Sequence, residues 1–274
     1  MKRGGGVRRK YHLYELFSLA ACCLCFFGCG LETIYALDEP MLLHSSTYST
    51  VQFEEKYFEF ETNEVKNSDP LINPPPFKFL GTDVYYKIYN RHESITSVTS
   101  ALSSANNSTD PSSAAKLLTE TYKYKQLGTS AGARTPLIQY EPPPSYPWPP
   151  YYNGHGRCVY IRLSSYQNDD YTAKFINNYT GDNSVTPTAV PRREGNRYSF
   201  DFGRDGDNDK ASKTLFSTDT DYNYSSSGFS SGYDNTYFVD MYAVSVGRDE
   251  NYTEHCSKVL HLGTVAINAS SKDN

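Results

Sequence analysis

Alternation between apolar and polar residues with a period of two is the feature that most constrains the fold of this chain. In segment 77–90, Val84, Tyr86 and Ile88 fall on one face of an extended chain. Such alternation is typical of an antiparallel strand with one buried face. Strands are expected at 51–62, 77–90, 157–166, 171–179, 197–203, 235–247 and 256–268.

About nine short strands separated by turn-rich segments predict an all-β fold, either an antiparallel sandwich or a barrel. One short helix is expected near 111–120, where Asp110 provides an N-cap and Pro111 the first helical residue. Segment 94–113 is rich in Ser, Thr, Ala and Asn and is expected to be a long polar loop. The proline-rich segment 141–156 is a connector and a candidate boundary between subdomains.

Residues 1–36 have the order of a secretory signal peptide. A basic opening that ends at Lys10 precedes the apolar run LFSLAACCLCFFGCG and a short polar exit. We expect cleavage after Ala36, with Gly30 as the alternative junction. The run has about 15 residues, fewer than the about 20 of a spanning helix, although an uncleaved anchor remains the alternative. The expected mature protein is one secreted domain, 37–274, without membrane attachment.

Removal of this leader leaves two cysteines, Cys158 and Cys256. Both lie in expected strands, and an oxidising compartment favours disulfide formation. We therefore expect a Cys158–Cys256 disulfide. In the chain-entropy view, closing a loop of about 100 residues stabilises a protein by roughly 4–5 kcal/mol.

Six Asn-x-Ser/Thr sequons predict N-glycosylation at the surface of a secreted chain. Two of them overlap, so one glycan at most is expected at that pair. The sequon asparagines are Asn106, Asn107, Asn178, Asn223, Asn251 and Asn268.

The composition disfavours nucleic acid and favours a protein partner. The chain has 26 Lys and Arg against 31 Asp and Glu, and no basic run follows Lys10, whereas nucleic-acid-binding proteins concentrate basic residues. Tyrosine, with 25 residues, suits half-buried strands and binding surfaces alike. Within the proline-rich connector, the candidate partner-binding residues are Tyr146, Trp148, Tyr151 and Tyr152.

No motif predicts catalysis, a metal site or a cofactor. GFSSG matches the nucleophile elbow of hydrolases at Ser230, and Asp240 and His255 follow in the order of a triad, but no helical pattern follows the motif. Asp219 and Asp221 resemble the start of a calcium loop, yet the glycine and glutamate that an EF-hand needs at positions six and twelve are missing. We therefore expect a binding protein and not an enzyme.

Several segments together resemble the tick salivary immunosuppressant family. They are the leader, FLGTDVYYKIYN, the polar loop with overlapping sequons, YPWPPYYNGHGRCVYIRLSSYQNDDYTAKFINNYT and TYFVDMYAVSV. Proteins of this family are secreted glycoproteins that suppress host T-lymphocyte responses. The resemblance implies a secreted tick saliva protein that modulates host immunity by protein–protein contact. The implied partner is a host protein, on an immune-cell surface or in solution.

Two other classes remain open. A lipocalin-like extracellular carrier of a small amine or lipid is the main alternative, because the mouth of a β-barrel can hold one small ligand. The long middle loops and the missing C-terminal helix count against it. An adhesive surface protein anchored by an uncleaved leader is the other.

Overall fold

The computed structural model describes residues 35–128, 135–142, 155–164, 173–178, 188–203 and 212–269. The chain from Tyr35 onward forms one compact unit. Within the described ranges, no helix has both the length and the apolar character needed to cross a membrane.

Two long antiparallel strands form the centre of the larger, seven-stranded sheet. β3 (Lys78–Tyr89) pairs with β9 (Thr236–Arg248) along almost its whole length. β10 and β11 pair with the other edge of β9, while β4, β5 and β8 pair in turn with the other edge of β3. Their bounds are β4 Lys125–Gln126, β5 Ile138–Gln139, β8 Tyr222–Asn223, β10 Glu254–Cys256 and β11 Leu260–Asn268.

The smaller sheet has four antiparallel strands in the order β1, β2, β6, β7. Their bounds are β1 Met41–His44, β2 Phe58–Glu61, β6 Cys158–Arg162 and β7 Lys174–Asn178. Because side chains alternate along each strand, one face of this sheet presents a continuous apolar surface.

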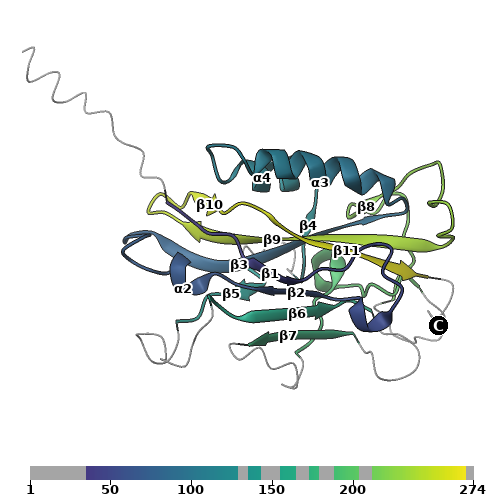
Figure 1. Cartoon of the computed structure of the whole chain (residues 1–274), viewed down its shortest axis with the longest axis horizontal. Helices are drawn as coiled ribbons and strands as arrows, with labels where there is room; N and C mark the ends of the chain where they lie inside the picture. Colours follow the sequence, from purple (N-terminus) through teal and green to yellow (C-terminus); the bar gives the residue numbers. More distant parts are fainter. Residues whose placement is uncertain are drawn as a thin grey trace, which may run out of the picture. The chain divides into compact units, whose positions relative to one another are not determined.

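The two sheets pack face to face, with the larger sheet between the smaller sheet and the helices (Figure 1). The predicted all-β sandwich is therefore confirmed. The alternating residues that predicted β3 are the ones that enter this core. Its fully buried members include Phe58, Phe60, Val84, Tyr86, Ile88, Val159, Ile161, Val239, Met241 and Ala243.

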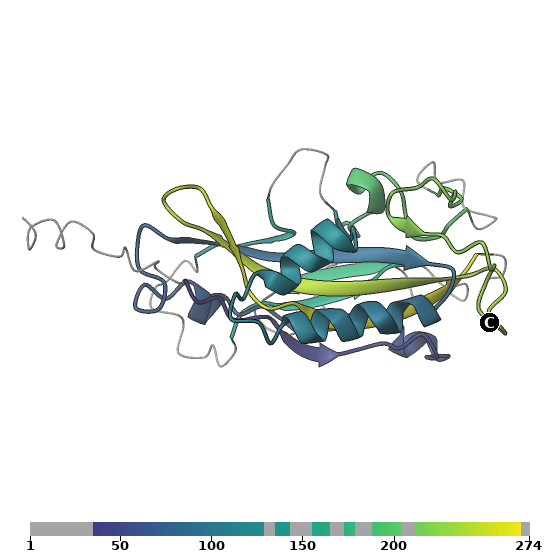
Figure 2. The same ribbon diagram turned by 90° about the horizontal axis from the view of Figure 1, so that it is seen from above.

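Helices cover the opposite face of the larger sheet (Figure 2). α3 (Glu93–Ala105) buries Ile95, Val98 and Leu102, which are spaced so as to share one side of a helix. α4 (Ser113–Lys116) runs into the π-helical turn η2 (Leu117–Thr121), and both pack in the same apolar cluster. The remaining short helices are η1 Phe53–Glu55, α2 Glu64–Asn67 and α5 Arg193–Asn196.

A close backbone approach joins the two sheets at one edge. The Thr264 amide donates to the carbonyl oxygen of Ser46 at 2.9 Å, next to Gly263. Gly263 has a φ of +114°, and a Cβ atom at this position would lie 2.2 Å from the Ser46 oxygen. Only glycine fits both constraints.

The structure differs from the expected elements in four places. The expected strand 256–268 is interrupted, because Cys256 ends β10 and β11 begins only at Leu260. The helix near 111–120 is confirmed by α4 and η2, but the expected loop 94–113 is wrong, because α3 occupies most of it. The expected strand 197–203 is also wrong, since it holds only one isolated bridge, at Tyr198. In 51–62, only the last part is a strand, β2, and a 3-10 turn precedes it.

The predicted Cys158–Cys256 disulfide is wrong, because both cysteines are free thiols. Cys158 lies in the smaller sheet, whereas Cys256 packs with the helices on the outer face of the larger sheet. A disulfide needs Cα atoms within about 7 Å, and packed sheets alone are about 10 Å apart. Burial also raises the pKa of Cys256 to about 12, which keeps its thiol protonated.

Candidate functional site

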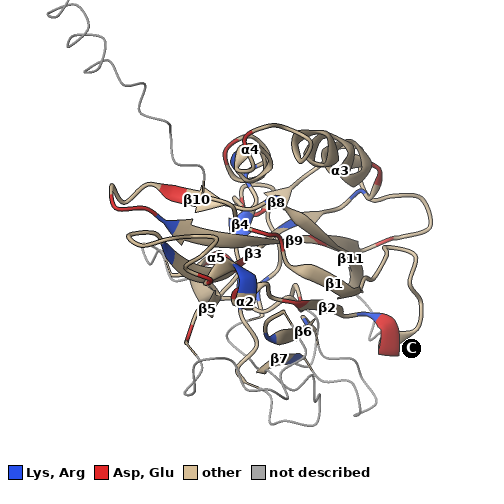
Figure 3. Cartoon of the chain, turned by 60° about the vertical axis from the view of Figure 1, so that its left-hand side comes forward, with Lys and Arg blue, Asp and Glu red and all other residues tan. Residues whose placement is uncertain are grey.

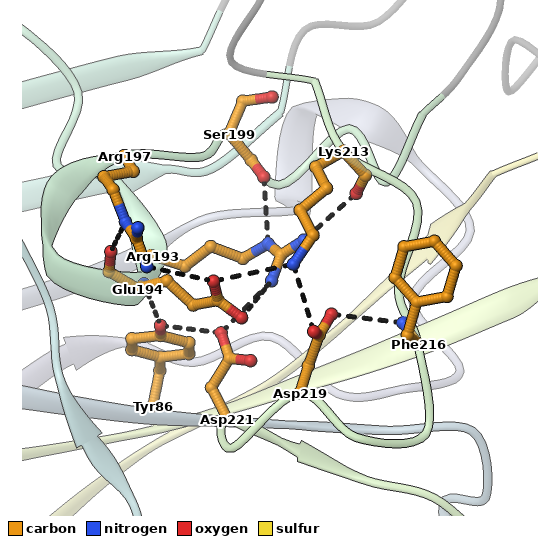
Figure 4. A network of polar contacts seen from close by, with 9 residues as sticks. All are labelled: Tyr86, Arg193, Glu194, Arg197, Ser199, Lys213, Phe216, Asp219 and Asp221. Carbon is orange, nitrogen blue, oxygen red and sulfur yellow. Dashed lines mark hydrogen bonds and ion pairs between the residues drawn. The ribbon is translucent and has the colours of Figure 1, made fainter.

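A fully buried arginine organises one end of the sandwich. Arg193 begins α5 and is 0% exposed. Its guanidinium group contacts a carboxylate oxygen of Asp221 at 3.3 Å and donates to the carbonyl oxygens of Lys213 and Ser199 at 3.0 and 3.3 Å (Figure 4). A buried charge is tolerated only with such compensation. Arg193 therefore holds three separate chain segments together.

Tyr86 connects this arginine cluster to the central strand β3. The Tyr86 hydroxyl donates to Asp221 at 2.9 Å and accepts the Glu194 amide at 2.9 Å. Burial raises the pKa of Tyr86 far above its usual value, with the Asp221 charge adding to the effect. The hydroxyl therefore stays a hydrogen-bond donor, and the loop 188–203 is fixed to the core.

Three carboxylates lie close together beside Arg193. Two of them belong to Asp219 and Asp221, the acidic pair noted in the sequence. One oxygen each of Glu194, Asp219 and Asp221 lies within 4.8 Å of the others. The second oxygen of Asp221 is buried without a hydrogen-bond partner, which by itself would favour a cation. However, the Lys213 ammonium already lies 3.0 Å from Asp219 and 3.6 Å from Glu194.

The charges of this cluster balance. Arg193, Lys213 and Arg197 face the three carboxylates, since Arg197 contacts Glu194 at 3.6 Å. Burial alone would raise the pKa of Asp219, but the Phe216 amide and Lys213 outweigh it and lower that pKa. The arrangement is a set of ion pairs in which lysine supplies the cation, and it does not call for a metal ion.

A pocket of about 470 Å³ opens beside the loop that Arg193 holds. This volume falls within the range of small-molecule sites. Its polar groups include Asp201, whose carboxylate accepts the Ser164 hydroxyl at 3.0 Å. The lining residues are Leu163, Ala173, Ala189, Val190, Pro191, Arg192, Asn196, Ser199, Phe200 and Asp201.

Three of the sequon asparagines are exposed at separate places on the surface. Asn107 follows α3, Asn223 lies in β8 and Asn251 lies in the turn between β9 and β10. Asn178 and Asn268 are half-buried at the ends of β7 and β11. The exposed positions are the ones that a folded glycoprotein can accommodate most easily.

Asn106 has a structural role that separates it from its neighbour Asn107. Its side-chain amide donates to the Val259 carbonyl oxygen at 2.9 Å, and its oxygen accepts the Val259 amide at 2.9 Å. A glycan on Asn106 would replace one hydrogen of the side-chain nitrogen that donates to Val259 and place a bulky group at this half-buried contact, just before β11. The overlapping sequons therefore favour Asn107 as the glycan site.

The serine of the GFSSG motif also has a structural role. Ser230 is 1% exposed, donates to Glu93 at 2.7 Å and accepts the His92 amide at 3.0 Å, at the start of α3. Asp240 and His255 each bond to other side chains. The motif thus fixes a loop to a helix and forms no triad.

The predicted partner-binding residues Tyr146, Trp148, Tyr151 and Tyr152 lie outside the described residues, as do residues 1–34 of the leader. The cluster around Arg193 was not predicted. Its available signal was the pair Asp219 and Asp221, which the sequence analysis considered only as a calcium loop.

Acidic and basic residues are interspersed over the described elements (Figure 3).

Comparison with protein-family models, curated proteins and solved structures finds no match to this chain.

Proposed function

We propose that this chain is a secreted, N-glycosylated binding protein that modulates a host immune response by contact with a host protein. The immune role comes from the resemblance to the tick salivary immunosuppressants. The exposed sequons at Asn107, Asn223 and Asn251 support a glycosylated surface.

The observation that carries the contact function is a rigidly presented phenylalanine. Phe216 is 57% exposed, and its ring lies at the edge of the charged cluster, with the Lys213 ammonium 5.8 Å from the ring centroid (Figure 4). Its amide donates to the Asp219 carboxylate at 3.1 Å, and the Asp219 amide donates back to the Phe216 carbonyl oxygen at 2.9 Å. Lys213 ties Asp219 to Glu194.

A turn held in this way loses little conformational entropy when a partner binds, which increases affinity. Aromatic side chains are enriched at the centres of protein interfaces. Among the described residues, we therefore assign Phe216 as the residue that contacts the partner. The ion pairs around Arg193 hold the turn that carries it.

The test compares the secreted protein with Phe216→Ala and with Leu71→Ala, which truncates another exposed apolar residue, 92% exposed. Binding to activated T lymphocytes is measured by flow cytometry, and suppression is measured as proliferation. We expect Phe216→Ala to weaken both about tenfold or more and Leu71→Ala to change neither. Equal activity of Phe216→Ala would refute the contact assignment. A parent protein without saturable binding or suppression would refute the function.

The pocket beside Arg192 favours a second candidate, a carrier of a small amine with an apolar body. Asp201 offers a carboxylate for an ammonium group, and Leu163, Val190 and Phe200 offer apolar contact. The ligand would lie at the end of the sandwich, because side chains fill the space between the sheets. Native mass spectrometry of the secreted protein should then reveal a bound molecule that Asp201→Asn loses, and retention by that variant would refute the amine assignment.

A further inference from the structure

The residues just before β1 belong to the folded body. The ring of Tyr35 stacks on Phe77 with centroids 4.5 Å apart and planes inclined by 22°. It also meets the ring of His255 edge-on at 5.2 Å. Leu37, Phe77 and Phe79 form a small apolar cluster at the start of β3, and Tyr35 packs against it.

The backbone of the same segment is held by two buried asparagines. The Asn73 side chain donates to the carbonyl oxygen of Ala36 at 2.9 Å. The Asn67 side chain accepts the Asp38 amide at 2.8 Å and donates to the Asp38 carbonyl oxygen at 2.9 Å. Asn67 and Asn73 are 1% and 4% exposed, and Leu37 is 6% exposed. The chain is thus fixed from Tyr35 onward and not only from β1.

Cleavage after Ala36 would damage this arrangement in two ways. It would remove Tyr35, and with it the ring that stacks on Phe77. It would also place a new, charged α-amino group on Leu37, which is buried, and remove the carbonyl oxygen that Asn73 contacts. A charged α-amino group at a buried residue is costly. The buried Asn73 amide would keep only its second hydrogen bond, to the Asn67 carbonyl oxygen at 3.1 Å, and its other hydrogen would lose its acceptor.

The sequence offers a junction upstream that spares the segment. Signal-peptide cleavage sites typically carry small residues at the last and third-last positions of the leader. Cleavage after Gly30 places Gly30 and Gly28 there, whereas cleavage after Ala36 places the branched Ile34 at the third-last position. The earlier junction therefore satisfies both the recognition rule and the packing of the mature protein.

We propose that the leader is removed between Gly30 and Leu31, so that Tyr35 stays in the mature protein as part of its fold. Water adds across that peptide bond and leaves a carboxylate on Gly30 and an amino group on Leu31. This inference rests on the proposed secretion, and it replaces Ala36 as the expected junction.

In the first experiment, the full chain is expressed in a secreting eukaryotic host. The N-terminus of the protein released into the culture medium is then determined by Edman sequencing. A first residue of Leu31 is the expected result. A first residue of Leu37 would overturn this inference and leave the proposed secretion intact. A chain that retains its leader and stays with the membrane fraction would overturn both.

A second experiment tests the packing argument without relying on processing. Forms that begin at Leu31 and at Leu37 are compared by thermal unfolding, together with Tyr35→Ala in the longer form. The matched control is Tyr252→Ala, since Tyr252 is 80% exposed. We expect the melting temperatures of the Leu37 form and of Tyr35→Ala to lie about 5 °C or more below that of the Leu31 form. The control should have the same melting temperature as the Leu31 form. Equal melting temperatures for all forms would overturn the inference.

Discussion

Replacing Asp83 with asparagine should stabilise the protein at pH 8, because this buried carboxyl group is costly to ionise. Asp83 lies on β3 and is 6% exposed. Its Oδ1 accepts hydrogen bonds from the Gln126 side chain and the Leu137 amide, and its Oδ2 accepts one from the Tyr85 hydroxyl. Burial raises the pKa of Asp83 to about 7, despite these three bonds, each of which lowers it.

The magnitude follows from the linkage between proton binding and folding. The ordinary pKa of an aspartate is 3.8, so the folded state binds more protons than the unfolded state between about pH 4 and pH 7. Stability therefore falls as the pH rises through this window. A difference of about 3 pKa units corresponds to about 4 kcal/mol once Asp83 is ionised in both states.

Asparagine avoids this loss because it carries no charge. Its oxygen, in the place of Oδ1, can still accept the Gln126 side chain and the Leu137 amide. Its amide, in the place of Oδ2, can donate to the Tyr85 hydroxyl, which then acts as the acceptor. We therefore expect a gain of about 2 to 4 kcal/mol at pH 8 and almost none at pH 4.

Urea unfolding between pH 4 and pH 8 measures this difference as a change in midpoint at constant m-value. Glu250→Gln is the control, because Glu250 is exposed and its substitution should leave the pH profile unchanged. The reasoning would be refuted if Asp83→Asn were less stable than the parent at pH 8. An offset that stays constant from pH 4 to pH 8 would refute it as well.

Three further predictions concern the charged cluster, the glycans and the cysteines. Arg193→Met should reduce the free energy of unfolding by about 3–5 kcal/mol, because it leaves a buried carboxylate without its cation. Arg197→Met is the control and should change the free energy of unfolding little, because the Arg197 side chain is 67% exposed. Urea unfolding measures both variants. Asn107→Gln should lower the intact mass of the secreted protein by one glycan, whereas Asn106→Gln should leave the glycan count unchanged and lower the melting temperature. A thiol assay on the unfolded secreted protein should detect two free thiols per chain, and detection of none would restore the disulfide.

The long strands could be predicted because their signal is local. In β3 and β9, alternate residues face the space between the sheets, and the expected segments 77–90 and 235–247 match the observed strands to within one residue at each end. Strands of this length average out single exceptions to the pattern. The short strands β4, β5 and β8 have two residues each, too few for a periodic signal, and they exist only because β3 provides an edge to pair with.

α3 was missed for a different reason. Ser and Thr dominate its composition and favour caps and turns over helix interiors, so the segment looked like a loop. The spacing of Ile95, Val98 and Leu102 was the available helical signal. Packing of that apolar side against the larger sheet outweighs the weak intrinsic propensity.

The cluster around Arg193 could not be predicted, because its partners are distant in the chain. Asp221 lies 28 residues from Arg193 and 135 residues from Tyr86, so no short window of sequence contains the arrangement. In isolation, Arg193, Glu194 and Arg197 look like a solvated charged turn. The fold buries Arg193, and Glu194 and Arg197 then become parts of the ion-pair cluster around it. Any function at this end of the sandwich, whether it uses Phe216 or the pocket, therefore depends on a side chain that contacts neither a partner nor a ligand.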